Sequence, residues 1–176
     1  LPVELTATQT RWVGVPSGLV FGHDISERRH AEARMRQLSS ALEQTADSVL
    51  ITDKTGVIEY VNPAFVLISG YGPSEVLGQK PSLIRSGKHS AAFYQNLWQT
   101  ILAGQAFREV FINRHKNGTF YYEEKTITPL KNASGLITHF ISTGKDVTER
   151  MQAQERMQYM AQHDALTALP NRLLLL

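Results

Sequence analysis

The chain has 176 residues, of which 42% are hydrophobic and 19% are charged, and its formal net charge is +2. Such values are typical of one globular domain of about 100–150 residues with additional segments. The small net charge argues against binding to nucleic acid or to an anionic membrane. Because there is no cysteine, disulfides, thiolate metal sites and a covalent flavin–cysteine adduct are excluded. No apolar run is as long as a membrane span, so we expect a cytoplasmic segment without membrane contact, whose parent protein could be anchored by upstream segments.

The N-terminal part has the composition of two strands, VELTATQTRWVGV and LVFGH, joined by a turn at PSG. Two strands alone cannot enclose a core, so we expect residues 1–23 to be the tail of a preceding domain. From Asp24 the pattern becomes helical, and Asp24 with Glu27 has the spacing of a capping box. Four apolar residues follow in steps of 4, 3 and 4: Ala31, Met35, Leu38 and Leu42. This stripe fits either packing on its own domain or a coiled coil between two copies, and the polar remainder of the helix favours the coiled coil.

The central part begins with two strands, SVLITD and VIEYVN, separated by the turn KTG. Asn62 fits the N-cap of a helix and Pro63 fits its first position. Gly70 and Gly78 fit the ends of two short helices, because glycine is common at the residue after a helix.

A longer helix is predicted over 91–103, after Ser90 and before Gly104. One side of this helix collects five apolar residues: Phe93, Leu97, Trp98, Ile101 and Leu102. Three strands follow, of which the first two flank the hairpin signal Asn117-Gly118 and the last two are joined at NASG. Two strands, several helices and three strands predict an α+β fold, in which a five-stranded antiparallel sheet carries its helices on one face.

Adjacent acidic residues on the second of these strands, Glu123 and Glu124, point to opposite faces of the sheet. They therefore cannot form an acid–base pair, and we expect one to be solvated and the other to meet Lys125 or an arginine. The histidines show no spacing typical of a metal site, so we predict no bound metal.

One eight-residue pattern occurs twice, as GHDISERR from residue 22 and as GKDVTERM from residue 144. In the second copy, Asp146 and Glu149 again have the spacing of a capping box. Three further residues recur at the same offset, so the following pairs match: Ala31 and Ala153, Arg34 and Arg156, Met35 and Met157. So long a spacing indicates two domains in series, each ending at the same kind of junction with a helix.

The strand order, NPAF after the second strand, GYGPSEVLGQ and the closing DVTER resemble the PAS sensor family over about residues 41–150. The resemblance implies the PAS fold, flanked by N- and C-terminal linker helices. Residues 1–29 resemble the last strands and the exit motif of a second PAS domain.

The C-terminal HDALTALPNR resembles the opening of a GGDEF diguanylate cyclase domain, H-D-x-L-T-G-L-x-N-R, with Ala168 where glycine is typical. The active-site motif of that family is absent from the chain. The resemblance therefore implies a segment that is not itself an enzyme, from a protein that makes cyclic di-GMP. The alternative is that His163 is the phospho-accepting residue of a histidine kinase, but ALPNR after Thr167 favours the cyclase.

These patterns and resemblances divide the chain into five parts. They are the tail of a preceding PAS domain (1–23), a linker helix (24–46), the PAS domain (47–146), a signalling helix (147–161) and the truncated start of a GGDEF domain (162–176).

In the PAS family, an aspartate and the hydroxyl residue after it tie the last strand to the outgoing helix. The resemblance assigns signal transmission to Asp24, Ser26, Asp146, Thr148 and Glu149. It implies a homodimer that forms through the linker helices and regulates its own downstream GGDEF domain. The alternative from a different class is a ligand-free dimerisation spacer.

The stretch from SGKHSAAF to YYEE is similar to PAS domains of bacterial redox regulators that hold FAD non-covalently. The resemblance implies a flavin pocket that contains Trp98, Asn113 and Arg114. The chain departs from that family pattern at Phe107 and Glu109, where the family has W-x-G. Core packing is the alternative role of Trp98, and the sequence favours it because an aromatic at helical spacing is usually a core residue.

A haem site would need an axial ligand that faces the pocket, and haem-binding relatives commonly place a histidine on the long helix. The only histidine near that helix is His89, which comes before its start. Haem is therefore disfavoured, and a surface or capping role is expected for His89.

Overall fold

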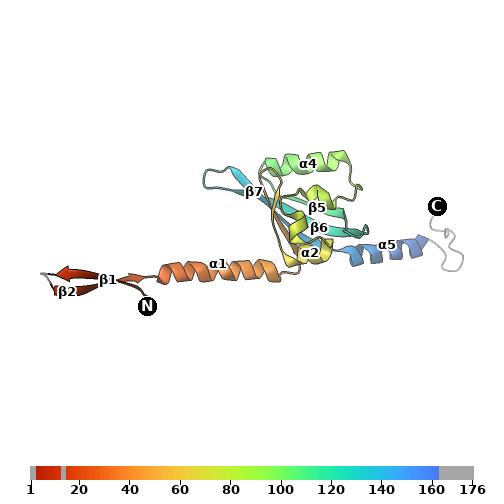
Figure 1. The fold of residues 1–176 in the computed structure, drawn as a ribbon. Coiled ribbons are helices and arrows are strands. Elements are labelled where there is room, and N and C mark those ends of the chain that lie inside the picture. The colour runs from red at the N-terminus through yellow and green to blue at the C-terminus, as the bar shows by residue number, and fades with distance from the viewer. Residues whose placement is uncertain (1–2, 13–14, 163–176) are drawn as a thin grey trace. The chain divides into compact units, whose positions relative to one another are not determined.

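The computed structural model describes residues 3–12 and 15–162 (Figure 1), and their contacts separate two units, 1–43 and 44–176. The elements of the first unit are β1 (Val3–Trp12), β2 (Val15–Asp24) and α1 (Ser26–Gln44). β1 and β2 pair in antiparallel register from Val3↔Asp24 to Trp12↔Val15.

The turn predicted at PSG is wrong. Pro16 pairs with Arg11 and Ser17 pairs with Thr10, so these residues lie inside the sheet. The connection falls at 13–14, outside the described residues. A continuous ladder over both strands outweighs the local turn preference of proline and glycine, because tertiary context decides strand formation.

The apolar stripe of α1 is exposed: Met35 is 69% exposed, Leu38 58% and Leu42 41%. A helix that leaves such a stripe in water is amphipathic without a covered face. This finding fits the coiled-coil interpretation of the stripe, and the dimer itself stays a prediction.

The second unit contains a five-stranded antiparallel sheet in the order β4-β3-β7-β6-β5. Its strands are β3 (Ser48–Asp53), β4 (Ile58–Val61), β5 (Phe107–Arg114), β6 (Phe120–Lys131) and β7 (Ile137–Asp146). Its helices are α2 (Pro63–Ser69), α3 (Pro73–Val76), the 3-10 turn η1 (Pro81–Ile84), α4 (Ala91–Leu102) and α5 (Thr148–Gln162). The predicted order of two strands, several helices and three strands is confirmed.

Asn62 organises the start of this unit. Its side-chain oxygen accepts hydrogen bonds from the N–H of Phe65, at 3.0 Å, and from the N–H of Val49, at 2.8 Å. Its amide nitrogen donates to the carbonyl of Asp47 at 2.9 Å. The predicted N-cap is confirmed, and this fully buried side chain also joins α2 to β3.

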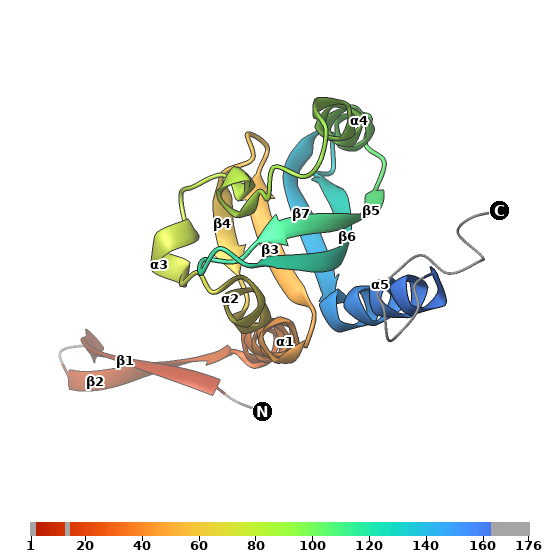
Figure 2. The same cartoon turned by 90° about the vertical axis from the view of Figure 1, so that its right-hand side faces the viewer.

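The helices α2, α3 and α4 and the turn η1 cover one face of the five-stranded sheet (Figure 2). Two clusters of buried apolar side chains lie between these layers. The first joins the β3–β4 end to the short helices: Leu50, Ile58, Val61, Phe65, Val76 and Ile84. The second joins the β5–β7 end to α4: Leu97, Ile101, Phe107, Phe111 and Phe140. The core is therefore divided along the sheet.

Candidate functional site

A cavity of about 390 Å³ lies between the covered face of the sheet and the segment from η1 to α4. Its apolar wall draws on both clusters and includes Leu50, Ile84, Leu97, Ile101, Phe111 and Phe140. Its polar wall includes Thr52, Asn113, Lys125 and Ser142 from four strands of the sheet. Small-molecule sites commonly enclose about 300–1,000 Å³ and combine apolar walls with a few placed polar groups. The cavity has the size and lining of such a site.

Trp98 lines this cavity and remains 37% exposed. Its indole meets Phe140 edge to face, with 6.0 Å between the ring centroids. The favoured interpretation of Trp98 as a core residue is therefore corrected. The residues that α4 buries are Leu97 and Ile101, whereas Leu102 is 60% exposed, because successive helical residues are rotated by about 100° from one another.

Asn113 and Arg114, the other two residues assigned to a flavin pocket, lie apart. Asn113 is buried in the cavity wall, whereas Arg114 is exposed and outside the described residues that line the cavity. Alternation of side chains along β5 separates them. The arginine that lines the cavity is Arg85. Its guanidinium carbon, Cζ, lies 3.8 Å from the centroid of the Tyr94 ring. Sequence reasoning missed Arg85, although the basic residues at either end of KPSLIR are a signal for it.

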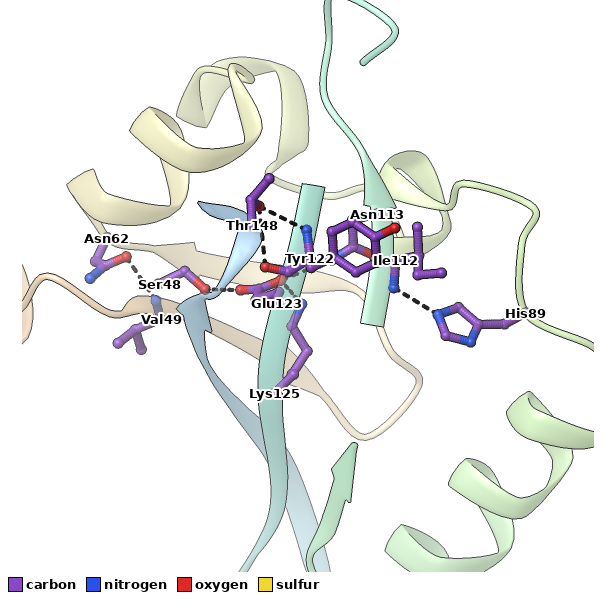
Figure 3. A network of polar contacts seen from close by, with 10 residues as sticks. All are labelled: Ser48, Val49, Asn62, His89, Ile112, Asn113, Tyr122, Glu123, Lys125 and Thr148. Carbon is purple, nitrogen blue, oxygen red and sulfur yellow. Dashed lines mark hydrogen bonds and ion pairs between the residues drawn. The ribbon is translucent and has the colours of Figure 1, made fainter. Parts of the chain in front are cut away.

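A buried polar cluster, which we call the Glu123 cluster, consists of Ser48, Asn113, Glu123 and Lys125 (Figure 3). One carboxylate oxygen of Glu123 accepts from the amide of Asn113 and pairs with the ammonium of Lys125, both at 2.8 Å. The other oxygen accepts from the hydroxyl of Ser48. The expected contact between an acidic residue and Lys125 is confirmed. The burial of this contact was not predicted, because the alternation of side chains along β6 does not reveal which face of the sheet the helices cover.

The neighbouring Glu124 lies on the opposite face of β6 and is also paired. It contacts Arg108 at 2.7 Å and Arg150 at 3.6 Å. The hydrogen bond from Arg108 is the main reason why the pKa of Glu124 lies below its ordinary value. The side chain of Glu124 is 31% exposed, so the carboxylate that was expected to be solvated also has arginine partners.

The segment after η1 is attached to β5, an edge strand of the sheet, at Ile112 (Figure 3). The N–H of Ile112 donates to Nε2 of His89 at 2.8 Å, and its carbonyl accepts from the hydroxyl of Ser86. Burial lowers the pKa of His89, and the Glu109 carboxylate partly offsets that effect. A neutral imidazole nitrogen is the acceptor that this bond requires. His89 therefore holds a loop to the sheet, a role more specific than the surface or capping role expected for it.

The second junction lies where β7 passes into α5 (Figure 3). Asp146 accepts from the N–H of Thr148 at 2.8 Å. The Thr148 hydroxyl accepts from the N–H of Tyr122 at 2.9 Å, and the N–H of Val147 donates to the Tyr122 carbonyl at 2.9 Å. The motif thus ties the outgoing helix to β6, the neighbour of the last strand.

The first junction repeats the local part of this arrangement, since Asp24 accepts from the N–H of Ser26 at 2.9 Å. The close contact with Ser26 lowers the pKa of the Asp24 carboxyl. The return bonds of the two predicted capping boxes, from Glu27 and Glu149, are absent among the hydrogen bonds of residues 3–12 and 15–162. Each helix instead begins two residues after the aspartate, which displaces the glutamate from the N3 position.

The model of the PAS fold family matches residues 36–147, the part of the chain that contains the five-stranded sheet and the cavity and ends within the second junction. The chain belongs to the PAS family. It is 32% identical over 116 residues to a nitrogen fixation regulatory protein of Klebsiella pneumoniae, covering 66% of this chain and 23% of that protein. It is 30% identical over 112 residues to a blue-light-activated histidine kinase of Brucella canis, covering 62% of this chain and 23% of the kinase. The chain therefore spans about a quarter of the length of these relatives.

Solved structures show the same fold. An RNA-binding light-oxygen-voltage receptor superposes with a TM-score of 0.67 at 22% identity, covering 91% of this chain and 43% of the receptor. A light-oxygen-voltage domain studied with a flavin analogue superposes with a TM-score of 0.58 at 19% identity, covering 69% of this chain and 96% of that one. The α+β PAS fold inferred from the sequence is confirmed.

Two further properties concern the described residues alone. None of their helices is long and apolar enough to cross a membrane. Among the same residues, no group of three or more His, Asp or Glu side chains is placed to hold a metal ion.

Residues 163–176, which carry the resemblance to a GGDEF domain and the alternative phospho-accepting His163, lie outside the described part of the chain. The division into five parts stays a prediction.

Proposed function

We propose that this PAS domain is a sensor that binds a flavin non-covalently in its cavity and passes the state of the flavin to α5. The observation that carries the proposal is the cavity itself, because Trp98 and Asn113 both line it. An indole can pack against a planar ring, and an asparagine amide can pair with the donor–acceptor edge of an isoalloxazine. The light-oxygen-voltage domains among the structures of this fold support a ligand of this kind.

Two exposed cations of the cavity lining support the same class of ligand. Lys80 and Arg85 both line the cavity, in addition to the buried Lys125. An arginine guanidinium and a lysine ammonium are suited to the phosphate groups of FMN or FAD. With no cysteine in the chain, such a flavin would be held without a covalent bond to the protein.

The output is proposed to be a diguanylate cyclase, regulated through a homodimer of the linker helices. HDALTALPNR supports the cyclase, and the exposed stripes on α1 and α5 support the dimer, since Met157 is 67% exposed and Met160 63%. The PAS segment itself is proposed to be non-enzymatic. The Brucella relative supports histidine-kinase output as the second candidate. Formation of cyclic di-GMP from GTP by the full-length protein would support the cyclase, whereas autophosphorylation from ATP would support the kinase.

An absorption spectrum of the freshly purified protein tests the flavin. Bands near about 370 and 450 nm, lost on heating with release of free flavin, are the expected result. Trp98→Ala and Asn113→Leu should lower the flavin content, and Arg114→Ala is the matched control because Arg114 is exposed away from the cavity lining. A spectrum without these bands, unchanged after reconstitution with FMN and FAD, would overturn the flavin and favour the ligand-free spacer.

A further inference from the structure

The Glu123 cluster spans the distance between the cavity and the second junction. Lys125 and Asn113 line the cavity, whereas Glu123 and Ser48 are outside the described residues of its lining. Glu123 is 1% exposed, and two of its partners, Asn113 and Lys125, belong to that lining. A ligand in the cavity would therefore meet the ammonium of Lys125, and Glu123 would sense the ligand through that ammonium.

The ammonium of Lys125 can donate more hydrogen bonds than it makes within the described residues. It carries three N–H groups, and its polar contact among residues 3–12 and 15–162 is the 2.8 Å ion pair with Glu123. It also lies 5.5 Å from the centroid of the Phe111 ring, another residue of the cavity wall. A buried ammonium interacts favourably with acceptor or anionic groups and unfavourably with apolar ones. The ligand group that suits this end of the cavity is a carbonyl or an anionic edge.

The other end of the cluster reaches β7 beside the junction. The Glu123 carboxylate lies so close to the backbone of Gly144 that a Cβ atom there would overlap it. Ser48, which donates to the same carboxylate, pairs with Gly144 in the β3–β7 ladder. The residue before Glu123 is Tyr122, whose N–H and carbonyl hold Thr148 and Val147. A displacement of the carboxylate would thus act on both strands that hold the start of α5.

Stability alone does not explain such a pair. Replacing a buried ion pair by apolar residues of similar volume is often neutral or stabilising, whereas removing one partner is strongly destabilising. A pair that is costly to separate and unnecessary for packing can act as a two-state element. Its equilibrium would be biased by a group that competes for the ammonium.

We propose that Lys125 is the residue of this domain that contacts the bound ligand. The Glu123–Lys125 pair then passes the effect of ligand binding from the cavity to the second junction. An acceptor edge of the ligand draws the ammonium away from Glu123. The carboxylate then shifts between Ser48 and Gly144, and the hydrogen bonds of Tyr122 with Val147 and Thr148 weaken. This inference rests on the proposed function only in that a ligand enters the cavity.

Amide hydrogen exchange at Tyr122 and Val147 tests the transmission without any ligand. Lys125→Met should accelerate exchange at both amides by about tenfold or more, because the buried carboxylate loses its cation. The double variant Glu123→Gln/Lys125→Met should restore slow exchange, since it removes the unpaired charge. Lys54→Met, a change of the same kind in the exposed β3–β4 turn, is the matched control. Wild-type exchange rates in folded Lys125→Met would overturn the proposal.

FMN is the probe for the contact between the ligand and Lys125. In the wild-type protein, FMN should accelerate exchange at the two amides. In the double variant, which is expected to fold, FMN should bind at least about tenfold more weakly and should leave exchange unchanged. An unchanged affinity, or an unchanged response to bound FMN in the double variant, would overturn the role of Lys125.

Failure of FMN to bind the wild-type protein would overturn the flavin proposal alone, because the ligand-free exchange experiment still decides the transmission step. If Lys125→Met does not fold, recovery of folding and slow exchange in the double variant decides that step.

Discussion

The two junctions of this chain have nearly the same sequence and different surroundings. In both, an aspartate oxygen accepts from the N–H two residues later, at 2.9 Å for Asp24 and 2.8 Å for Asp146. Only the second junction follows a five-stranded sheet, and there Thr148 and the buried Val147 are bound to β6. The first follows a two-stranded sheet. The local hydrogen bond therefore comes with the motif, and the coupling to a sheet needs a neighbouring strand.

The equivalent glycines of the two motifs should give the largest difference. Gly144→Ala is expected to lower the free energy of unfolding of the PAS domain by about 3 kcal/mol, because the added methyl group overlaps the buried Glu123 carboxylate. A Cβ at Gly22 would meet the side chain of Val3 at 3.1 Å on an exposed sheet, so Gly22→Ala should change stability by less than about 1 kcal/mol.

Urea unfolding measures the first effect through the fluorescence of Trp98 in a Trp12→Phe background. Amide exchange along β2 measures the second. Equal small effects at the two glycines would contradict the close contact between Glu123 and the β7 backbone, and with it the difference between the junctions.

The hydroxyl residues should give the next largest difference. Thr148→Val removes the acceptor for the N–H of Tyr122 and should lower the free energy of unfolding by about 1–2 kcal/mol. Thr148→Ser keeps the hydroxyl and should retain most of the stability. Ser26→Ala at the first junction should leave urea unfolding of the PAS domain unchanged. A stable Thr148→Val variant would show that the other contacts, such as the Val147 N–H bond and the Arg150–Glu124 pair, hold the helix to β6.

The aspartates should behave alike at the two junctions, with a smaller effect. Asp146→Ala and Asp24→Ala each remove one acceptor at the start of a helix, and each should increase fraying of the first turn. Exchange of the amides of Thr148 and Ser26 measures it, and Asn in place of either aspartate should preserve slow exchange. A markedly larger effect at Asp146 would mean that its hydrogen bond also supports the contact with β6.

His89 makes the same kind of contact as Thr148, but with a group that titrates. Its pKa is lowered in the folded protein, so its stabilising contribution is complete above the unfolded value of about 6.5 and is lost as the pH falls below it. Urea unfolding at about pH 7.5 and about pH 5 should show a small loss of stability at the lower pH. His89→Gln keeps an acceptor without titrating and should lose less. An identical pH dependence in both proteins would assign the loss to other groups.

Much of the fold was predictable because its signals are local. The caps at Asn62 and Ser90 and the glycine after α2 each act through the nearest turn of the chain. PSG was misleading because a long ladder overrode a local preference for a turn. The core role favoured for Trp98 was wrong, because helical spacing does not show whether an apolar side chain packs in the core or faces a cavity.

The site was predictable only in part. Asn113 and Trp98 were found through a resemblance and do line the cavity, whereas Arg85 was missed and Arg114 is exposed elsewhere. A contact of one of the two glutamates with Lys125 or an arginine was anticipated, and its burial was not. Its burial depends on which face of β6 the helices cover, and no property of β6 itself encodes that choice.

The sequence by itself determined the order of strands and helices, the two aspartate junctions and the absence of cysteine chemistry, because each depends on residues within a few positions of one another or on composition. The tertiary structure decided the rest. Strand order brought Tyr122 to Thr148 and Ser48 to Glu123, which are far apart in the chain. Layer packing then enclosed the cavity and buried a charged pair in its wall. Burial and long-range pairing arise from the sheet as a whole, so they could be read only from the folded chain.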